Sequence, residues 1–136
     1  MGAAYRGKKA MAYNEPGRLI GLHHVQLAMP PHEEETAIAF YEGVLGLEQI
    51  PKPQELADLG GVWFRSGDLQ VHLGVEEGFH PAMKAHPAFL VEDLERMRAR
   101  VEMSGYKIVE SVQFSGFRRV HIRDPFGNRL ELIEPE

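Results

Sequence analysis

Apolar and polar positions alternate along the chain in a pattern that occurs twice. Each time, a strand with period-two alternation is followed by a helix with period 3.6 and then by three more strands. The predicted helices are 33–45 in the first half and 94–104 in the second. The predicted strands are 20–29, 47–51, 61–65 and 69–75 in the first half, and 86–91, 106–112, 118–123 and 129–133 in the second. The pattern therefore predicts an α+β chain made of two βαβββ modules.

A fixed offset relates the two halves. Gly46 follows the first predicted helix and Gly105 follows the second, and glycine is the usual residue just beyond a helix end. These two glycines are 59 positions apart, and so are His72 and Glu131. A constant offset between similar halves indicates an internal duplication.

The duplication suggests how the chain is organised. We expect a flexible N-terminal arm at residues 1–18, a first module at 19–77, a connector at 78–85 and a second module at 86–136. A four-stranded sheet is too small to close a core alone. We therefore expect the modules to pack as one domain, with the helices outside and a curved, partly open mixed sheet forming a cup.

Composition narrows the chemistry. The 136 residues suit one domain, and the absence of cysteine excludes disulfides and thiolate metal sites. A net charge of -5 argues against nucleic-acid binding, which favours a basic face. No apolar run has the length of a membrane span or resembles a signal peptide, so we predict a cytoplasmic protein without a membrane partner.

Four polar residues fall on the strand face opposite the aliphatic positions, namely His24, His72, His86 and Glu131. Strand order matches His24 with His86, and the fixed offset matches His72 with Glu131. Three imidazoles and one carboxylate converging in a cup would bind one divalent transition metal, with Zn, Ni, Fe, Co and Mn all compatible. Open coordination positions could then bind two neighbouring oxygens of a small-molecule substrate.

Other residues of the cup and of the connector are candidates for substrate contacts, although each could equally be a rim or solvated residue. They are Gln26, Trp63, Lys84, Arg119 and His121. No functional role is predicted for His23, which has the wrong parity, or for His32 and His80, which fall in predicted loops.

Four segments resemble the vicinal oxygen chelate superfamily, which includes glyoxalase I, fosfomycin-resistance, bleomycin-resistance and extradiol dioxygenase proteins. The segments are 22–28 (LHHVQLA), 39–41 with 45–47 (AFY and LGL), 86–89 (HPAF) and 124–131 (DPFGNRLE). The resemblance implies paired βαβββ modules around a metal, with ligands at His24, His86 and Glu131. His72 falls at a position where members have Glu, Gln or a residue that is not a ligand.

The resemblance implies a metal-dependent enzyme that chelates adjacent oxygens and acts as a lyase or isomerase through an enediolate or oxyanion intermediate. Glu131 would serve as the catalytic base if it leaves the metal. If only His24, His86 and Glu131 bind, the set is that of an iron(II) ring-cleaving dioxygenase. Thiol-dependent fosfomycin resistance and metal-free drug binding are further alternatives. We expect a homodimer, with modules paired either within a chain or between chains.

Overall fold

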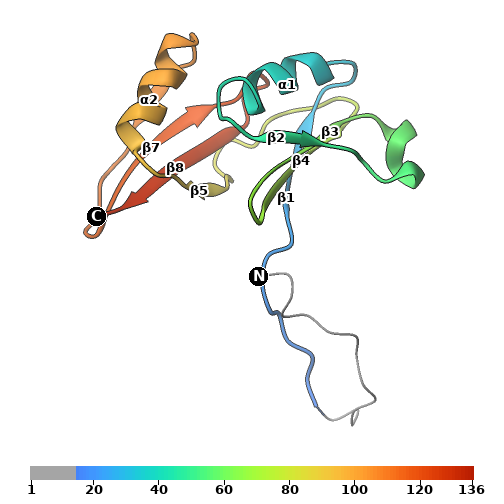
Figure 1. Ribbon diagram of the computed structural model, residues 1–136, viewed down its shortest axis with the longest axis horizontal. Coiled ribbons are helices and arrows are strands. Elements are labelled where there is room, and N and C mark those ends of the chain that lie inside the picture. Colours follow the sequence, from blue (N-terminus) through green and yellow to red (C-terminus); the bar gives the residue numbers. More distant parts are fainter. Residues whose placement is uncertain (1–14) are drawn as a thin grey trace.

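The computed structural model describes residues 15–136, which form two modules, each with one α-helix and four strands (Figure 1). The N-terminal module contains β1 (Val25–Met29), α1 (Glu34–Tyr41), β2 (Glu48–Ile50), a 3-10 helix (Gln54–Leu59), β3 (Val62–Ser66) and β4 (Leu69–Val75). The C-terminal module contains β5 (Ala88–Leu90), α2 (Leu94–Met103), β6 (Ile108–Glu110), β7 (Phe117–Arg123) and β8 (Arg129–Pro135).

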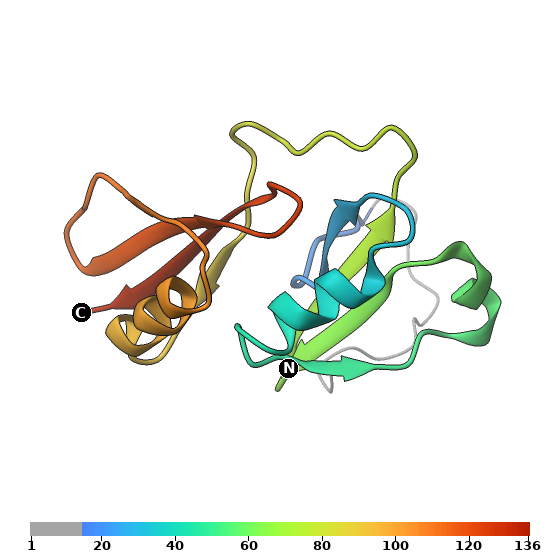
Figure 2. The same cartoon turned by 90° about the horizontal axis from the view of Figure 1, so that it is seen from above.

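The two sheets have the same topology, which confirms the duplicated α+β architecture. Their strand orders are β1-β4-β3-β2 and β5-β8-β7-β6, so each sheet is mixed, with one parallel pair and two antiparallel pairs. The sheets remain separate and open. Figure 2 shows the modules side by side, joined by the long connector between β4 and β5.

The registers of the sheets also correspond. His72 on β4 and Glu131 on β8 occupy equivalent positions in the second strand of each sheet. Their cross-strand partners are Gln26 and Trp63 for the first and Ala88 and His121 for the second. His24 and His86 each lie two residues before the β1 or β5 partner, as the predicted symmetry requires. The register further makes His121 the equivalent of Trp63.

The aliphatic faces of both sheets enter one core, which the two modules share. Phe64, Val71, Ile122 and Leu130 are among its fully buried members. Aromatic contacts cross between the modules: the rings of Phe40 on α1 and Tyr106 before β6 lie 4.8 Å apart. The polar faces of the strands are thereby left for the site, as the alternation predicts.

A buried hydrogen-bond network fastens the β7–β8 turn to the N-terminal module. The Tyr41 hydroxyl donates to Asp124 Oδ2 at 2.7 Å, and Asn128 Nδ2 donates to the Ala28 carbonyl at 2.8 Å. Burial raises the pKa of Asp124 despite four hydrogen bonds that favour its charged form, and burial beside Asp124 raises the pKa of Tyr41 well above its ordinary value. Because β8 follows this turn, the network helps to position the candidate site.

Several elements are shorter than predicted. β1 begins at Val25 rather than at residue 20, and the apolar Leu19 and Leu22 before it are exposed. α1 ends at Tyr41 because the next turn widens: the amides of Gly43 and Leu45 bond to carbonyls five residues earlier. Part of the predicted loop at 52–60 is a 3-10 helix.

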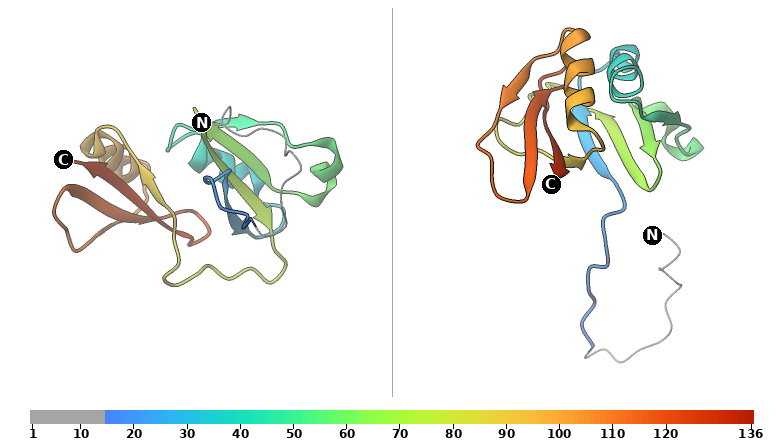
Figure 3. Two further views of the ribbon diagram at one scale, coloured as in Figure 1. Left: turned by 90° about the horizontal axis from the view of Figure 1, so that it is seen from below. Right: turned by 60° about the vertical axis from the view of Figure 1, so that its left-hand side comes forward.

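Two further expectations concern the chain as a whole. The predicted arm at residues 1–18 lies almost entirely outside the described residues, so it stays a prediction. In residues 15–136, neither the length nor the apolar character of any helix would let it cross a lipid bilayer. Figure 3 shows, from two further sides, each helix lying beside the sheet of its own module.

Candidate metal centre

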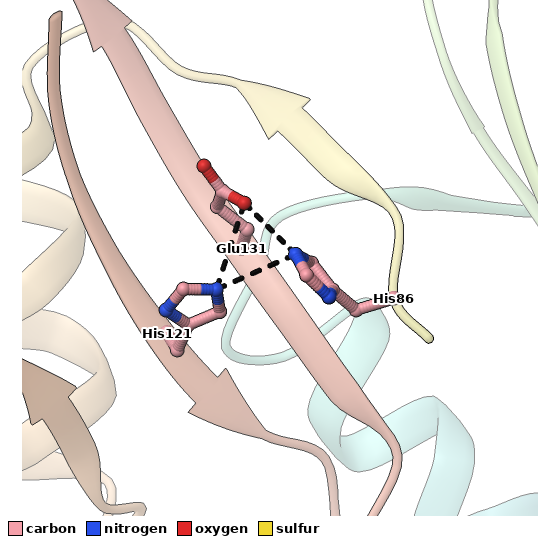
Figure 4. Close-up of side chains that lie close together, drawn as sticks. All are labelled: His86, His121 and Glu131. Atoms are coloured by element: carbon pink, nitrogen blue, oxygen red, sulfur yellow. Dashed lines mark hydrogen bonds and ion pairs between the residues drawn. The ribbon is translucent and has the colours of Figure 1, made fainter. Parts of the chain in front are cut away.

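Three side chains of the C-terminal module point toward one another: His86, His121 and Glu131 (Figure 4). His86 Nε2 lies 2.9 Å from Glu131 Oε1, His121 Nε2 lies 3.5 Å from the same oxygen, and the two Nε2 atoms lie 3.4 Å apart. Within the described chain, no other three His, Asp or Glu side chains bring their ligand atoms within 4.8 Å of one another. The structure thus brings together two of the four predicted ligands and one predicted substrate contact.

Local structure determines where each of these side chains lies. His121 and Glu131 face each other in register across β7 and β8. The turn joining these strands is held by Asp124, whose Oδ1 accepts from the amides of Phe126 and Asn128 at 2.9 and 2.8 Å. The Pro87 carbonyl accepts a hydrogen bond from the Glu131 amide at 3.0 Å, which holds the segment carrying His86 against β8.

The hydrogen bonds around the cluster assign the imidazole tautomers. His86 Nδ1 donates to the Lys84 carbonyl at 2.7 Å, so the neutral ring has its lone pair on Nε2. An Arg129 N–H lies 3.4 Å from His121 Nε2 and can only donate, which makes Nε2 the acceptor and directs His121 Nδ1–H toward Ser111 Oγ. Two unprotonated ring nitrogens and a carboxylate therefore lie together, with Arg129 donating to one nitrogen and Arg119 donating to the carboxylate.

Burial and nearby charge set the ionisation of the cluster. Burial raises the pKa of Glu131, but its contacts with His86 and Arg119 outweigh burial and bring the pKa below its ordinary value. Burial and the guanidinium of Arg129 lower the pKa of His121. Both side chains are nearly inaccessible, with exposed fractions of 7% and 8%. At neutral pH the cluster is thus a carboxylate beside neutral imidazole, the forms that bind metals.

The geometry of the cluster fits a divalent metal. Donors bound to one ion at about 2.1 Å are separated by about 3.0 Å in octahedral and about 3.4 Å in tetrahedral coordination. The three observed separations, 2.9, 3.4 and 3.5 Å, lie close to this range. Nitrogen and oxygen donors suit the transition metals expected from the sequence.

The other two predicted ligands lie in the first sheet. The His24 and His72 rings stack at 4.1 Å, and Trp63 covers the opposite face of His72 at 3.7 Å. His72 Nε2 is 2.9 Å from Gln70 Oε1. Burial, and to a smaller extent the neighbouring His24 and His23, lowers the pKa of His72 to about 4. No group of three donors in residues 15–136 includes either His24 or His72.

The predicted substrate contacts differ in whether their side chains contact the cluster. Arg119 Nη1 donates to Glu131 Oε2 at 3.3 Å, while its other N–H groups donate to the Val112 carbonyl. Lys84 is exposed and contributes its carbonyl to His86 rather than its side chain. A cavity of about 460 Å³ lies between β1 and the connector, and Gln26, His80, His86 and Arg129 contribute to its lining.

Sequence reasoning did not single out Ser111 or Arg129, the two residues that orient His121. It also treated His121 as a substrate contact only. One signal was available: the predicted turn is centred on Phe126, so His121 and Glu131, five residues on either side, should face each other in a hairpin.

Comparison with known proteins identifies the family of the chain. The family model described as the Glyoxalase/Bleomycin resistance protein/Dioxygenase superfamily matches residues 21–132. The chain belongs to this superfamily. The superfamily contains enzymes and resistance proteins with different activities, so membership does not select a reaction.

Solved structures agree with the assignment. A protein assigned to the glyoxalase family from Bacillus anthracis is 40% identical with a TM-score of 0.85, covering 89% of this chain and 99% of its own. A glyoxalase/dioxygenase from Nostoc punctiforme is 20% identical with a TM-score of 0.73, covering 96% and 99%. A variant of the fosfomycin resistance protein FosX from Listeria monocytogenes, complexed with Mn(II) and 1S,2S-dihydroxypropylphosphonic acid, is 18% identical with a TM-score of 0.72, covering 88% and 95%. No curated protein matches the chain.

Proposed function

We propose that the protein is a metal-dependent enzyme that binds a small molecule through two adjacent oxygens and acts as a lyase or isomerase. One observation carries this proposal: His86 Nε2 and Glu131 Oε1 lie 2.9 Å apart, with the ring lone pair directed at the carboxylate. A bound divalent ion would supply Lewis-acid polarisation of the substrate oxygens. The FosX complex with Mn(II) and a vicinal diol supports this substrate class by similarity of fold.

The metal ligands in this proposal are His86 and Glu131 together with His24 and His72, and the ion is Zn, Ni, Mn, Fe or Co. Since His24 and His72 stack in the other sheet, we propose that they come from a second copy of the chain. Exposed apolar side chains before β1 favour such a dimer: Leu19 and Leu22 are 98% and 77% exposed. β1 and β5 are also edge strands in their sheets, and within residues 15–136 no strand pairs with their outer sides.

The protein's own residues would hold and position the substrate. Arg119 keeps Glu131 charged, so that the carboxylate can bind the ion or accept a substrate proton. The cavity beside His86 has the size of small-molecule sites, and Gln26 and Arg129 provide polar groups in its lining. Trp63, which is stacked on His72, offers an aromatic surface on the opposite module.

A second candidate is an iron(II) ring-cleaving dioxygenase. The observation that favours it is the composition of the cluster, which is two imidazoles and one carboxylate on neighbouring strands. This is the facial triad of non-haem iron oxygenases. Thiol-dependent resistance and metal-free drug binding have no comparable support in the geometry.

Metal analysis tests the proposal directly. After purification without chelator, we expect about one divalent ion per chain in the wild type, and loss of that ion in His86→Ala and Glu131→Ala. His32→Asn is the matched control, because this exposed histidine lies outside the cluster and outside the cavity lining. Retention of the ion by both site variants would overturn the proposal. Oxygen uptake with a catechol after anaerobic iron reconstitution would establish the dioxygenase instead.

A further inference from the structure

Arg129 begins β8 at the point where the cavity beside β1 meets the candidate metal centre. It lines that cavity together with His86, and its guanidinium lies 3.4 Å from His121 Nε2. We propose that Arg129, with Arg123 opposite it adding positive charge, binds an anionic group of the substrate, so that the substrate is a small carboxylate or phosphonate with adjacent oxygens. The inference rests on the proposed function for the role of those oxygens, but binding of the anion is a separate property of the cavity.

Strand geometry brings a second guanidinium to the same place. Arg129 lies opposite Arg123 in the register of β7 and β8. Both positions share the sheet face of His121 and Glu131, because side chains two residues apart on a strand point to the same side. Directly opposed side chains of an antiparallel pair have Cβ atoms about 4.5–5.5 Å apart, and like charges at that distance repel each other. This end of the strand pair therefore carries a local excess of positive charge.

No carboxylate of residues 15–136 neutralises either guanidinium. Within these residues the Arg129 side chain donates only to the imidazole of His121, which carries no negative charge. The Arg123 side chain donates only to the Gly127 carbonyl, at 3.0 Å. Glu76 is the one acidic residue among those that line the cavity, and this exposed side chain forms no ion pair with either arginine.

Both guanidinia thus lack the anion that normally offsets their burial. Arg123 and Arg129 are half-buried, so each loses part of its hydration, and an anionic partner is the usual compensation for that loss. A guanidinium has five N–H donors and Arg129 uses one, which leaves its planar fork available for two parallel hydrogen bonds to a carboxylate or phosphonate. An anion bound by this fork would occupy the cavity that His86 also lines, with the charged end of the substrate beside the candidate metal centre.

Titration calorimetry of the full-length protein with three small probes tests this assignment. Glycerate and 1S,2S-dihydroxypropylphosphonic acid carry an anion as well as adjacent hydroxyl groups, whereas 1,2-propanediol carries the hydroxyl groups alone. We expect the zinc-loaded wild type to bind both anions more tightly than the diol, and whichever anion binds more tightly identifies the anionic group of the substrate.

The variant Arg129→Gln separates the contribution of the guanidinium from that of the ion, which also attracts anions. We expect it to weaken binding of the anions by about 10–100-fold, because a hydrogen bond to a charged group contributes one to two tenfold steps in affinity, and to leave binding of the diol unchanged. Arg118→Gln is the matched control, because this exposed guanidinium is on the opposite face of β7 and pairs with Glu134.

Arginine Nε–Hε spectra of the wild type give an independent readout that requires no substitution to fold. Glycerate should shift the Arg129 signal in the zinc-loaded and in the metal-free protein, and 1,2-propanediol should not. If the zinc-loaded wild type prefers neither anion to the diol, or if Arg129→Gln keeps the preference and the Arg129 signal does not move, the inference is wrong and the proposed function stands. If the wild type binds no divalent ion but the anions still shift the Arg129 signal, the proposed function fails and the anion site stands.

Discussion

Tyr41 is completely buried, and its hydroxyl is the donor that links α1 to Asp124 in the other module, at 2.7 Å. Replacing it by phenylalanine keeps the ring and its stacking against Phe64 at 5.5 Å but removes this donor. The remaining donors to Asp124 are the amides of Phe126 and Asn128 and the Asn128 side chain. The substitution therefore isolates one buried hydrogen bond between the modules.

The cost follows from the charge of the acceptor. A hydrogen bond to an ionised group contributes about 1.5–3 kcal/mol to stability, and a neutral one contributes about 1 kcal/mol. For a domain of this size, 1 kcal/mol corresponds to roughly 3–4 °C in Tm, so Tyr41→Phe should lower Tm by about 5–10 °C at neutral pH. Since burial raises the pKa of Asp124, protonation on acidification should reduce this cost toward that of a neutral hydrogen bond.

Urea unfolding of the metal-free protein at several pH values measures these effects. Tyr106→Phe is the matched control, because it also removes a tyrosine hydroxyl, and that hydroxyl makes no hydrogen bond within residues 15–136. A double-mutant cycle with Asp124→Asn should give a coupling energy above about 0.5 kcal/mol. Equal stability of Tyr41→Phe and Tyr106→Phe would show that the Tyr41–Asp124 contact does not stabilise the packing of the modules.

Three further predictions concern the site and its support. In the metal-free protein, burial and two neighbouring histidines lower the pKa of His72 to about 4. The folded chain then binds fewer protons than the unfolded chain between pH 6.5 and about 4, so stability should decrease as the pH is lowered across this range. Urea titrations should show a smaller decrease in His72→Gln. Arg119→Met should raise the pKa of Glu131 and move the pH midpoint of manganese binding upward, whereas Arg118→Met, whose guanidinium pairs with a different carboxylate, should not. Leu130→Ala should destabilise the fold by about 2–5 kcal/mol in urea, because this side chain is fully buried in the shared core; a cost below 1 kcal/mol would contradict that burial.

Local periodicity was sufficient to predict the architecture. Alternation along β4 and β8 identified which side chains enter the core, and the 3.6-residue period identified both helices, because pleat and helical pitch depend only on near neighbours. The same alternation placed His86 and Glu131 on one polar face. Element boundaries were less accurate, since the start of β1 depends on where its partner strand begins.

Convergence of particular side chains required the tertiary structure. The periodicity predicted that His24, His72, His86 and Glu131 share a type of face, but not that His24 and His72 stay outside the cluster formed by His86 and Glu131 in the described chain. That separation is decided by how the modules pack, through contacts such as Tyr41 with Asp124 between residues far apart in the chain. Alternation carries no information about such long-range distances, because strand parity specifies only the direction in which a side chain points.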